Sequence, residues 1–297
     1  FEYSNARIRS VSTERLSQEL DKRRIVVVTG FQGVNGTGDI TTLGRGGSDT
    51  SAVAIAAVLH ADKCQIFTDV EGVFTADPRK VEGAKKLDEI TYDEMMELAS
   101  LGAQVLHNRS VEMAKRYGVN LEVLSSYERK PGTQIKEVVN KVEQMKISGI
   151  AKDTNVARIA VVGVEDKPGI AFKIFRALAN AKINVDIILQ SIDRNGTNDI
   201  SFTVAESELT RAFDILKDRK EAIGYRELFA EKNVAKVSIV GAGMLSSSGI
   251  AATMFEALCD AKINIQMIST SEIKVSVLIE ESYADKAVQV IHNKFFS

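Results

Sequence analysis

The sequence of 297 residues has little of several features that mark specialised classes of protein. Its two cysteines, Cys64 and Cys259, lie far apart and have no Cys or His at metal-ligand spacing, so we expect two buried thiols in a reducing compartment. No apolar run approaches the roughly 18–20 residues of a membrane span. The first residues do not resemble a signal peptide and include no initiator Met. We therefore expect a cytoplasmic protein without a membrane partner, and a chain that begins inside a longer protein.

An excess of charge of one sign is also missing. The 38 Lys and Arg residues nearly balance the 40 Asp and Glu residues, which gives a formal net charge of -2. Nucleic acid normally requires a basic face, so we expect no nucleic-acid partner. Hydrophobic residues make up 44% and charged residues 26%, a composition typical of a globular protein, and the length suits about two domains.

The sequence is rich in glycine at residues 44–49, where it reads Gly-Arg-Gly-Gly-Ser-Asp. A short β-branched run at residues 25–28 precedes this stretch and predicts a buried parallel strand. An Ala-rich segment at residues 50–61 follows and predicts a helix, with Ser48 as its N-cap and Asp49 as an acid in its first turn. A long loop, residues 31–47, therefore leads to a helix N-terminus, and loops of that length are usually functional.

The residue types in this loop suit the binding of an anion. Glycines let the backbone approach a ligand closely, and the N–H groups at a helix start favour negative charge. The planar guanidinium of Arg45 suits a carboxylate or a phosphate. The alternative is that the glycines only turn the chain, because short motifs often match by chance.

Strands alternate with helices in the first half of the chain. Strands are predicted at residues 63–68, 121–124 and 133–135, and helices at residues 12–22, 92–101 and 104–117. This alternation favours βαβ units and a parallel sheet with helices on its faces. His107 then falls inside a helix, and we interpret it, like His60 and His292, as structural because no nucleophile signature accompanies it.

Charged residues follow the predicted strand at residues 63–68. Ligands of open α/β sheets bind beyond the carboxyl ends of strands, so Thr68 and Asp69 are candidates to contact a nucleotide or its Mg²⁺. Arg79 comes after Asp77 and Pro78, in a stiffened loop where a guanidinium can meet phosphate. The alternatives are a turn residue at Asp69 and a surface arginine at Arg79.

An internal repeat begins after about residue 140. Residues 157–163 match residues 235–241, and the Gly-Ile-Ala and Ala-Lys-Ile-Asn segments of the first copy also recur in the second. Each copy predicts strand, Gly loop, amphipathic helix, strand, strand and helix. The first copy adds a final strand near residues 225–231, which the second lacks. We expect residues 147–152 to cross over and fill that edge, so that the two copies intertwine.

The loops of the repeat suit a free amino acid. In the first copy, Pro168 and Gly169 lead into a helix whose N–H groups can hold a carboxylate. Asn184, Asp186 and Gln190 have even spacing on the predicted next strand, where Asp186 can take an amino group. The second copy has no Pro or acid in its loop and has glutamine at the position of Asp186, which makes it less suited to a charged ligand. The alternative is an ordinary half-polar strand.

Three motifs and the repeat together resemble the aspartate kinase family over essentially the whole chain. The motifs are the stretch at residues 44–49, Phe-Thr-Asp-Val-Glu-Gly-Val-Phe-Thr-Ala-Asp-Pro-Arg at residues 67–79, and Gly-Ala-Gln-Val-Leu-His at residues 102–107. The resemblance implies an α/β fold. Residues 1–140 would be the C-terminal, nucleotide-binding half of an amino-acid-kinase domain with a parallel or mixed sheet. Two ferredoxin-like βαββαβ ACT domains would follow, at residues 147–232 and 233–297.

The resemblance also implies an activity. Members of this family transfer the γ-phosphoryl group of MgATP to the β-carboxylate of L-aspartate to give 4-phospho-L-aspartate. Lysine, threonine or both inhibit them through the ACT domains, which commonly form a homodimer. ATP and Mg²⁺ would therefore be the cofactors and L-aspartate the substrate. The alternatives are a non-catalytic, amino-acid-binding regulatory subunit or a fragment of the enzyme, and a weaker one is another carboxylate kinase of the superfamily.

The resemblance assigns roles to residues. Arg45, Gly46, Gly47 and Ser48 would hold aspartate, with Arg45 on its α-carboxylate, and Asp49 would organise the reacting groups. The ATP contacts would be Thr68, Asp69, Phe74, Arg79, Gln104 and Val105. The effector contacts would be Asp166, Lys167, Pro168, Gly169, Ile170, Ala171, Asn184, Val185, Asp186 and Gln190 in the first copy, and Ile250, Ala251, Asn264, Ile265, Ser271 and Glu272 in the second. No resident metal site is expected. The family's Lys-Phe-Gly-Gly strand, whose lysine stabilises the transferred phosphoryl group, is absent, so we expect this chain alone to be inactive.

Overall fold

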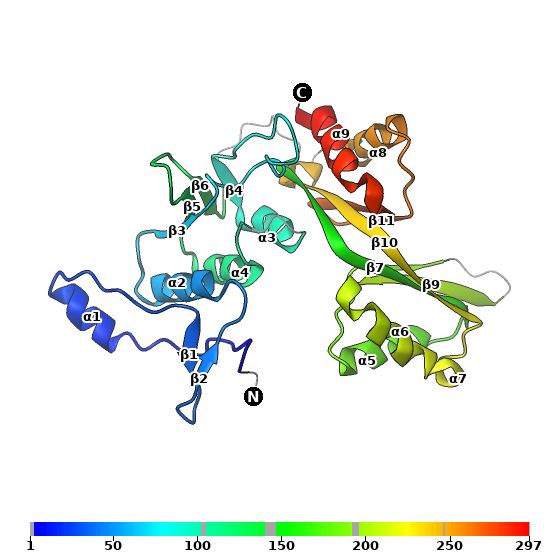
Figure 1. Ribbon diagram of the computed structural model, residues 1–297, viewed down its shortest axis with the longest axis horizontal. Coiled ribbons are helices and arrows are strands. Elements are labelled where there is room, and N and C mark those ends of the chain that lie inside the picture. Colours follow the sequence, from blue (N-terminus) through cyan, green and yellow to red (C-terminus); the bar gives the residue numbers. More distant parts are fainter. Residues whose placement is uncertain (1–2, 102–104, 140–146, 192–195, 246, 297) are drawn as a thin grey trace.

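The computed structural model describes residues 3–101, 105–139, 147–191, 196–245 and 247–296. The chain forms two regions that lie side by side (Figure 1). We call residues 3–136 the N-terminal region and residues 147–296 the repeat region. Helices α1 to α4 belong to the former, and the long strands β7 and β10 run through the latter.

The N-terminal region contains a mixed four-stranded sheet with the order β3-β5-β6-β4. The strands are β3 (Cys64–Thr68), β4 (Glu89–Thr91), β5 (Leu121–Ser125) and β6 (Thr133–Lys136). β3 pairs with β5 in parallel and β4 with β6 in parallel, whereas β5 and β6 are antiparallel. The helices are α1 (Glu14–Asp21), α2 (Gly47–Val58), α3 (Tyr92–Ser100) and α4 (Asn108–Tyr117). The predicted strands β3, β5 and β6 are therefore confirmed.

Local sequence explains where the helices of this region begin and end. α3 starts at a capping box in which the Thr91 side chain accepts from the Glu94 N–H and the Glu94 carboxylate accepts from the Thr91 N–H. α4 ends at Gly118, which adopts the left-handed conformation that glycine tolerates. Fully buried side chains from both helices, including Met95 and Val111, pack on the sheet in one apolar core.

The prediction of a buried strand at residues 25–29 is wrong. Ile25 and Val27 are 96% and 92% exposed, and no strand in the described part of the chain pairs with this segment. A β-branched run becomes a strand only where a neighbour accepts its hydrogen bonds and covers its side chains. The long loop that follows is also more regular than predicted, since β1 (Gln32–Val34) and β2 (Ile40–Thr42) form an antiparallel hairpin within it.

The repeat region is built on one antiparallel six-stranded sheet with the order β11-β12-β10-β7-β9-β8. Its two central strands, β7 (Gly149–Glu165) and β10 (Glu227–Val240), are long enough to serve both copies of the repeat. β8 (Ile188–Gln190) and β9 (Thr197–Val204) complete the first copy. β11 (Met267–Thr270) and β12 (Lys274–Glu280) complete the second.

The predicted crossover strand is confirmed. Residues Gly149 and Lys152 at the start of β7 pair with Val240 and Val237 of the second copy. Further along, Ile159 of the same strand pairs with Ala230 and with Phe202 of the first copy. The second copy therefore receives its edge strand from the start of the first, and the two copies share a single sheet.

Helices give each copy its own apolar core. α5 (Ile170–Asn180), α6 (Leu209–Lys217) and the short α7 (Lys220–Ile223) belong to the first copy, and α8 (Ile250–Asp260) and α9 (Ala284–Phe296) to the second. Short 3₁₀ turns lie at Glu206–Glu208, Ala242–Leu245 and Glu281–Tyr283. A small buried cluster lies at the seam where the copies meet and consists of Val156, Ile187, Val234, Met267 and Leu278.

Buried side chains form hydrogen bonds between the two regions. The buried Glu94 carboxylate of α3 accepts from the Ser148 hydroxyl at 2.5 Å and from the backbone N–H of Ala242 at 3.0 Å. His292 of α9 is also buried, and its Nε2 lies 2.9 Å from the hydroxyl of Thr75. Because these contacts are buried, they fix the second copy against the N-terminal region.

Two further findings concern side chains and helix length. Cys64 is buried as expected, but Cys259 on α8 is exposed, so the prediction of two buried thiols is half wrong. Among the described residues, every helix is too short or too polar to cross a membrane.

Candidate functional site

The glycine-rich loop forms the start of α2, but with a different cap from the predicted one. Gly46, not Ser48, is the N-cap, and it has a φ of 68°. A Cβ atom added to Gly46 would lie 2.2 Å from the Cβ atom of His107, so only glycine fits here. Gly47 is similarly close to the side chains of Leu43 and Phe31. The glycines therefore allow close packing as well as a tight turn.

The two side chains that we expect to meet an anion lie on the outside of this turn. Arg45 and Ser48 are both exposed and flank the first residues of α2. Arg45 directly precedes the N-cap of α2, so its guanidinium lies in the sequence next to the positive end of the helix dipole. Both favour a negatively charged ligand. The loop is held from within by hydrogen bonds from Thr50 Oγ1 to the Gly46 carbonyl and from Ser51 Oγ to the Gly47 carbonyl.

Asp49 lies deeper than its neighbours. Burial raises the pKa of its carboxyl group, although a hydrogen bond from the backbone N–H of His107 and the His107 side chain act in the opposite direction. Burial and the nearby charge of Asp49 in turn raise the pKa of the Cys64 thiol to about 11. Asp49 is thus an acid in a partly desolvated position at the base of the loop.

His107 and Arg109 support the loop from α4. His107 does not lie inside a helix as predicted, because the helix begins at Asn108 and His107 is its N-cap. The Arg109 guanidinium donates to the carbonyls of Leu43 and Ala6, at 2.8 and 2.9 Å. Sequence analysis missed Arg109 because its partners are backbone atoms far away in the chain, which leave no motif.

A second group of predicted residues follows β3. Thr68 ends the strand, and its hydroxyl donates to the carboxylate of the exposed Asp69 at 3.0 Å. The exposed Arg79 forms two hydrogen bonds with Asp77, each 3.0 Å long, through Nε and one terminal nitrogen. This pair lowers the pKa of the Asp77 carboxyl group and raises the pKa of Arg79, to which Asp69 contributes a smaller effect. Asp69 and Arg79 are therefore electrostatic neighbours.

The segment between Asp69 and Arg79 is fixed by contacts with the sheet. Gly72 leaves room for Thr133, whose hydroxyl accepts from the Val73 N–H at 2.8 Å and donates to the carbonyl of Leu87. Phe74 forms an isolated bridge with Lys86 and is partly buried. Sequence analysis missed Thr133, which anchors this segment from β6.

Two further predicted ATP contacts follow α3. Gln104 lies outside the described residues. Val105 is partly buried and packs against the core of the N-terminal region.

A cavity of about 690 Å³ lies beside the glycine-rich loop. The N-terminal segment, the β1–β2 hairpin and one face of α2 line it, with Leu43 and Ser51 nearest to the loop. Neither Arg45 nor Asp69 lines this cavity. The cavity is therefore distinct from the residues that the sequence predicts to bind aspartate and ATP.

The loop between β7 and α5 in the first copy leads into a helix start, as predicted. Gly169 is the N-cap of α5, with a φ of 97°, and Ile170 begins the helix. The Asp166 carboxylate accepts a hydrogen bond of 2.9 Å from Asn198 of β9. Asn198 is only 4% exposed, and its Oδ1 has no partner among the described residues. Lys167 pairs with Glu165, while Pro168 is exposed and Ala171 lies in the first turn of α5.

The segment after α5 differs from the prediction. Asn184, Val185 and Asp186 are not in a strand, because β8 begins only at Ile188, and Gln190 ends it. Asp186 is nevertheless held to β9, since its N–H donates to the Thr203 carbonyl. The Asp186 carboxylate forms an ion pair with Lys236 of the second copy.

The second copy repeats this arrangement with different polar groups. Gly249 is the left-handed N-cap of α8, and the helix begins with the buried Ile250 and the partly buried Ala251. Asn264 is exposed and Ile265 partly buried, ahead of β11. Ser271 and Glu272 lie in the exposed turn between β11 and β12. In the described part of the chain, no cluster of three or more His, Cys, Asp or Glu side chains could hold a metal ion.

The comparisons with known proteins agree with this architecture. Residues 1–125 match the model of the amino acid kinase family, and residues 159–219 and 237–295 match that of the ACT domain. The fold is therefore that of an amino-acid kinase with a pair of regulatory ACT domains.

The relatives narrow this class. An aspartokinase of Pseudomonas aeruginosa is 51% identical over 99% of this chain and 72% of its own length. The crystal structure of E. coli aspartokinase III in complex with aspartate and ADP (R-state) has a TM-score of 0.80 and 29% identity, over 96% of this chain and 64% of that one. The complex of the same enzyme with lysine and aspartate (T-state) covers the same shares, with a TM-score of 0.74. The chain belongs to the aspartate kinase family.

Proposed function

We propose that this protein phosphorylates the β-carboxylate of L-aspartate with MgATP as phosphoryl donor. The exposed Arg45 at the N-terminus of α2 supports this proposal, because a guanidinium beside a helix start suits the carboxylate of an amino acid. The solved relative that binds aspartate and ADP supports the choice of ligands.

We assign the remaining residues to two ends of the reaction. Gly46, Gly47 and Ser48 bring the N-terminus of α2 and a hydroxyl to aspartate, and Asp49 organises the reacting groups from its half-buried position. Asp69 and Arg79 face MgATP, with Arg79 on phosphate oxygens and Asp69 toward the Mg²⁺ that the nucleotide carries. Thr68, Phe74 and Val105 complete the nucleotide side.

Substitution of Arg45 tests the aspartate site. In the purified enzyme with the Lys-Phe-Gly-Gly part restored, Arg45→Ala should lower kcat/KM for aspartate by about 50-fold, because a charge-assisted hydrogen bond is lost. The KM for ATP should stay nearly constant, and Arg45→Lys should recover part of the loss. An equal rise of both KM values would contradict the assignment.

We further propose that lysine, threonine or both inhibit the enzyme through the ACT domains, which form a homodimer. The loops before α5 and α8 support effector binding, since each begins with a left-handed glycine and offers helix N–H groups to a carboxylate. The complex of a relative with lysine supports the ligand class. The exposed apolar side chains of Ile188 and Leu189 on the edge strand β8 support association through this region.

Calorimetric titration with each amino acid, singly and together, tests the effector site. We expect saturable binding of at least one of the two amino acids. If both bind at once, titration of one in the presence of the other should still show binding, with its affinity unchanged or altered. If neither amino acid binds at millimolar concentration, this part of the proposal is wrong, whatever the result for Arg45.

A further inference from the structure

The seam between the two repeat copies contains a buried ammonium group. Lys236 lies on the second-copy part of β10, and its side chain is only 8% exposed. Its neighbours in the cross-strand register are Leu278 and Asp153, and the apolar seam cluster lies beside it. A buried ammonium is stable only where carboxylates compensate it, so its partners define its role.

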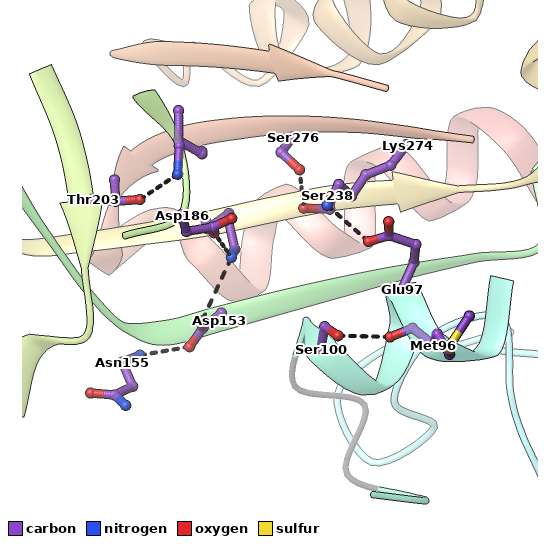
Figure 2. Close-up of polar contacts among 12 residues, drawn as sticks. Met96, Glu97, Ser100, Asp153, Asn155, Asp186, Thr203, Ser238, Lys274 and Ser276 are labelled. Atoms are coloured by element: carbon purple, nitrogen blue, oxygen red, sulfur yellow. Dashed lines mark hydrogen bonds and ion pairs between the residues drawn. The ribbon is translucent and has the colours of Figure 1, made fainter. Parts of the chain in front are cut away.

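Lys236 of the second copy has two carboxylates within reach, both on residues of the first copy. It forms an ion pair with Asp186, and its Nζ lies 3.9 Å from Oδ2 of Asp153 on β7. In Figure 2, dashed lines run from Asp186 and Asp153 to the same nitrogen atom. The other oxygen of Asp153 accepts from the Asn155 N–H at 2.9 Å, which fixes the carboxylate in this position. Lys236 is thus closely paired with one carboxylate and near a second.

The equivalent position of the first copy behaves differently. Arg158 takes the place of Lys236 in the repeat, and it pairs at 2.5 Å with Glu231, which lies opposite it in the sheet. Gln266, which stands where the first copy has Asp186, donates to Glu231 only at 3.4 Å. A neutral amide thus replaces the charged partner from the other copy. The choice between two carboxylates is therefore a property of Lys236 and not of the repeat in general.

The Asp186 carboxylate also faces solvent. Its side chain is 51% exposed, so its carboxylate is open to solvent while it holds Lys236. Under the proposed function, this carboxylate takes the ammonium group of an amino-acid effector. Two ammonium groups on one carboxylate repel each other, so a ligand there weakens the hold of Asp186 on Lys236.

Asp153 connects this seam to the N-terminal region. It lies on β7 three residues after Ile150, whose N–H donates to the Thr75 carbonyl at 2.8 Å. Thr75 belongs to the segment between Asp69 and Arg79 that we assign to MgATP. Ser148, just before this strand, donates to Glu94 of α3. A change in the charge balance at Asp153 therefore acts on β7, which directly contacts the segment between Asp69 and Arg79.

We propose that Lys236 is a switch cation between Asp186 and Asp153. Lys236 holds Asp186 while the effector site is empty, and it moves to Asp153 when the ammonium group of an amino acid binds Asp186. The two arrangements have different affinities for the effector, which is what allosteric coupling requires. This inference rests on the proposed effector site at Asp186.

The test separates effector binding from inhibition. L-lysine and L-threonine, singly and together, are titrated by calorimetry against the enzyme with the Lys-Phe-Gly-Gly part restored, and their inhibition of aspartate phosphorylation is measured on the same samples. In Lys236→Met, binding should be retained, and the concentration needed for half-inhibition should rise at least about tenfold. Lys236→Arg keeps the charge and should keep most of the inhibition. Arg158→Met, at the matched position of the first copy, should leave the relation between binding and inhibition unchanged.

Asp153→Asn provides a second measurement that does not remove the buried cation. It weakens the second position of Lys236, so effector binding and inhibition should both weaken, by about tenfold. Normal inhibition in Lys236→Met overturns the switch. If Lys236→Met does not fold, normal inhibition in Asp153→Asn overturns it. If the unchanged enzyme binds neither amino acid, the effector site itself is overturned, and the switch with it.

Discussion

The two regions of this protein complete their sheets in different ways. In the repeat region, β7 and β10 each pass through both copies, and the start of β7 fills the edge that the second copy leaves open. In the N-terminal region, four short strands form a mixed sheet, and the apolar segment at residues 25–29 is exposed. A repeat can supply its own pairing partner, whereas a single α/β unit depends on contacts with other segments. Three predictions, in order of expected effect, test how far the regions depend on each other.

The joint between the regions should be the most sensitive point. Glu94→Ala removes the carboxylate half of the α3 capping box and the acceptor of the Ser148 hydroxyl and the Ala242 N–H. We expect the free energy of unfolding to fall by about 4 kcal/mol, because buried donors lose their partners. Chemical denaturation measures this change. Glu97→Gln is the control on the same helix, where a partly exposed pair with Lys274 is lost, and its cost should stay below about 1 kcal/mol.

Figure 2 shows this control pair, Glu97 and Lys274, beside Ser238 and Ser276 of the second copy. If Glu94→Ala and Glu97→Gln destabilise the protein equally, the joint does not depend on the buried carboxylate.

The glycine-rich loop should matter to the N-terminal region alone. Gly46→Ala places a Cβ atom against His107 at a positive φ, and we expect a loss of about 3 kcal/mol. Gly83→Ala is the matched control, because it has a positive φ of 84° and open space around it, so strain alone should cost about 1 kcal/mol. Hydrogen exchange would locate the effect of Gly46→Ala around α2 and α4. Equal loss of protection in β7 and β10 would contradict the separation of the regions.

The contact between His292 and Thr75 should give the smallest effect, one that depends on pH. Burial, and to a lesser degree the charge of Lys85, lower the pKa of His292 below its ordinary value of 6.5. As the pH falls below 6.5, the unfolded chain takes up a proton before the folded protein does, so stability falls and then levels off below the folded pKa.

His292→Gln should remove this dependence, at a cost of about 1 kcal/mol above neutral pH. Urea denaturation at about pH 8 and about pH 5.5 measures both effects. His60→Asn, at an exposed histidine with positive φ, should keep the pH dependence of the unchanged protein. An identical pH dependence in His292→Gln would show that another group is responsible.

Much of the fold could be predicted because local patterns and tertiary contacts agree. The run at Cys64–Thr68 and the repeat at residues 157–163 and 235–241 gave strands where the structure has them. The same reasoning failed at residues 25–29, because a β-branched run says nothing about whether a partner strand is present. It also failed at His107, since apolar spacing does not show that a helix begins one residue later with the histidine as its cap.

The candidate sites could be predicted only where residue type and position in the chain carry the chemistry. Motifs identified Arg45 and Asp69, whose chemistry is carried by residue type and loop position. They did not identify Arg109 or Asn198, whose partners come from distant segments. They also did not show that Asp186 already holds an ammonium group from the other copy.

The sequence by itself determined most of the strands and helices, the two copies of the repeat and the family to which the chain belongs, because these depend on spacing and residue type along the chain. Only the tertiary structure decided which carboxylate pairs with Lys236, which residue caps each helix and how the repeat region contacts the segment between Asp69 and Arg79. These depend on distances between residues far apart in sequence, and folding alone sets those distances.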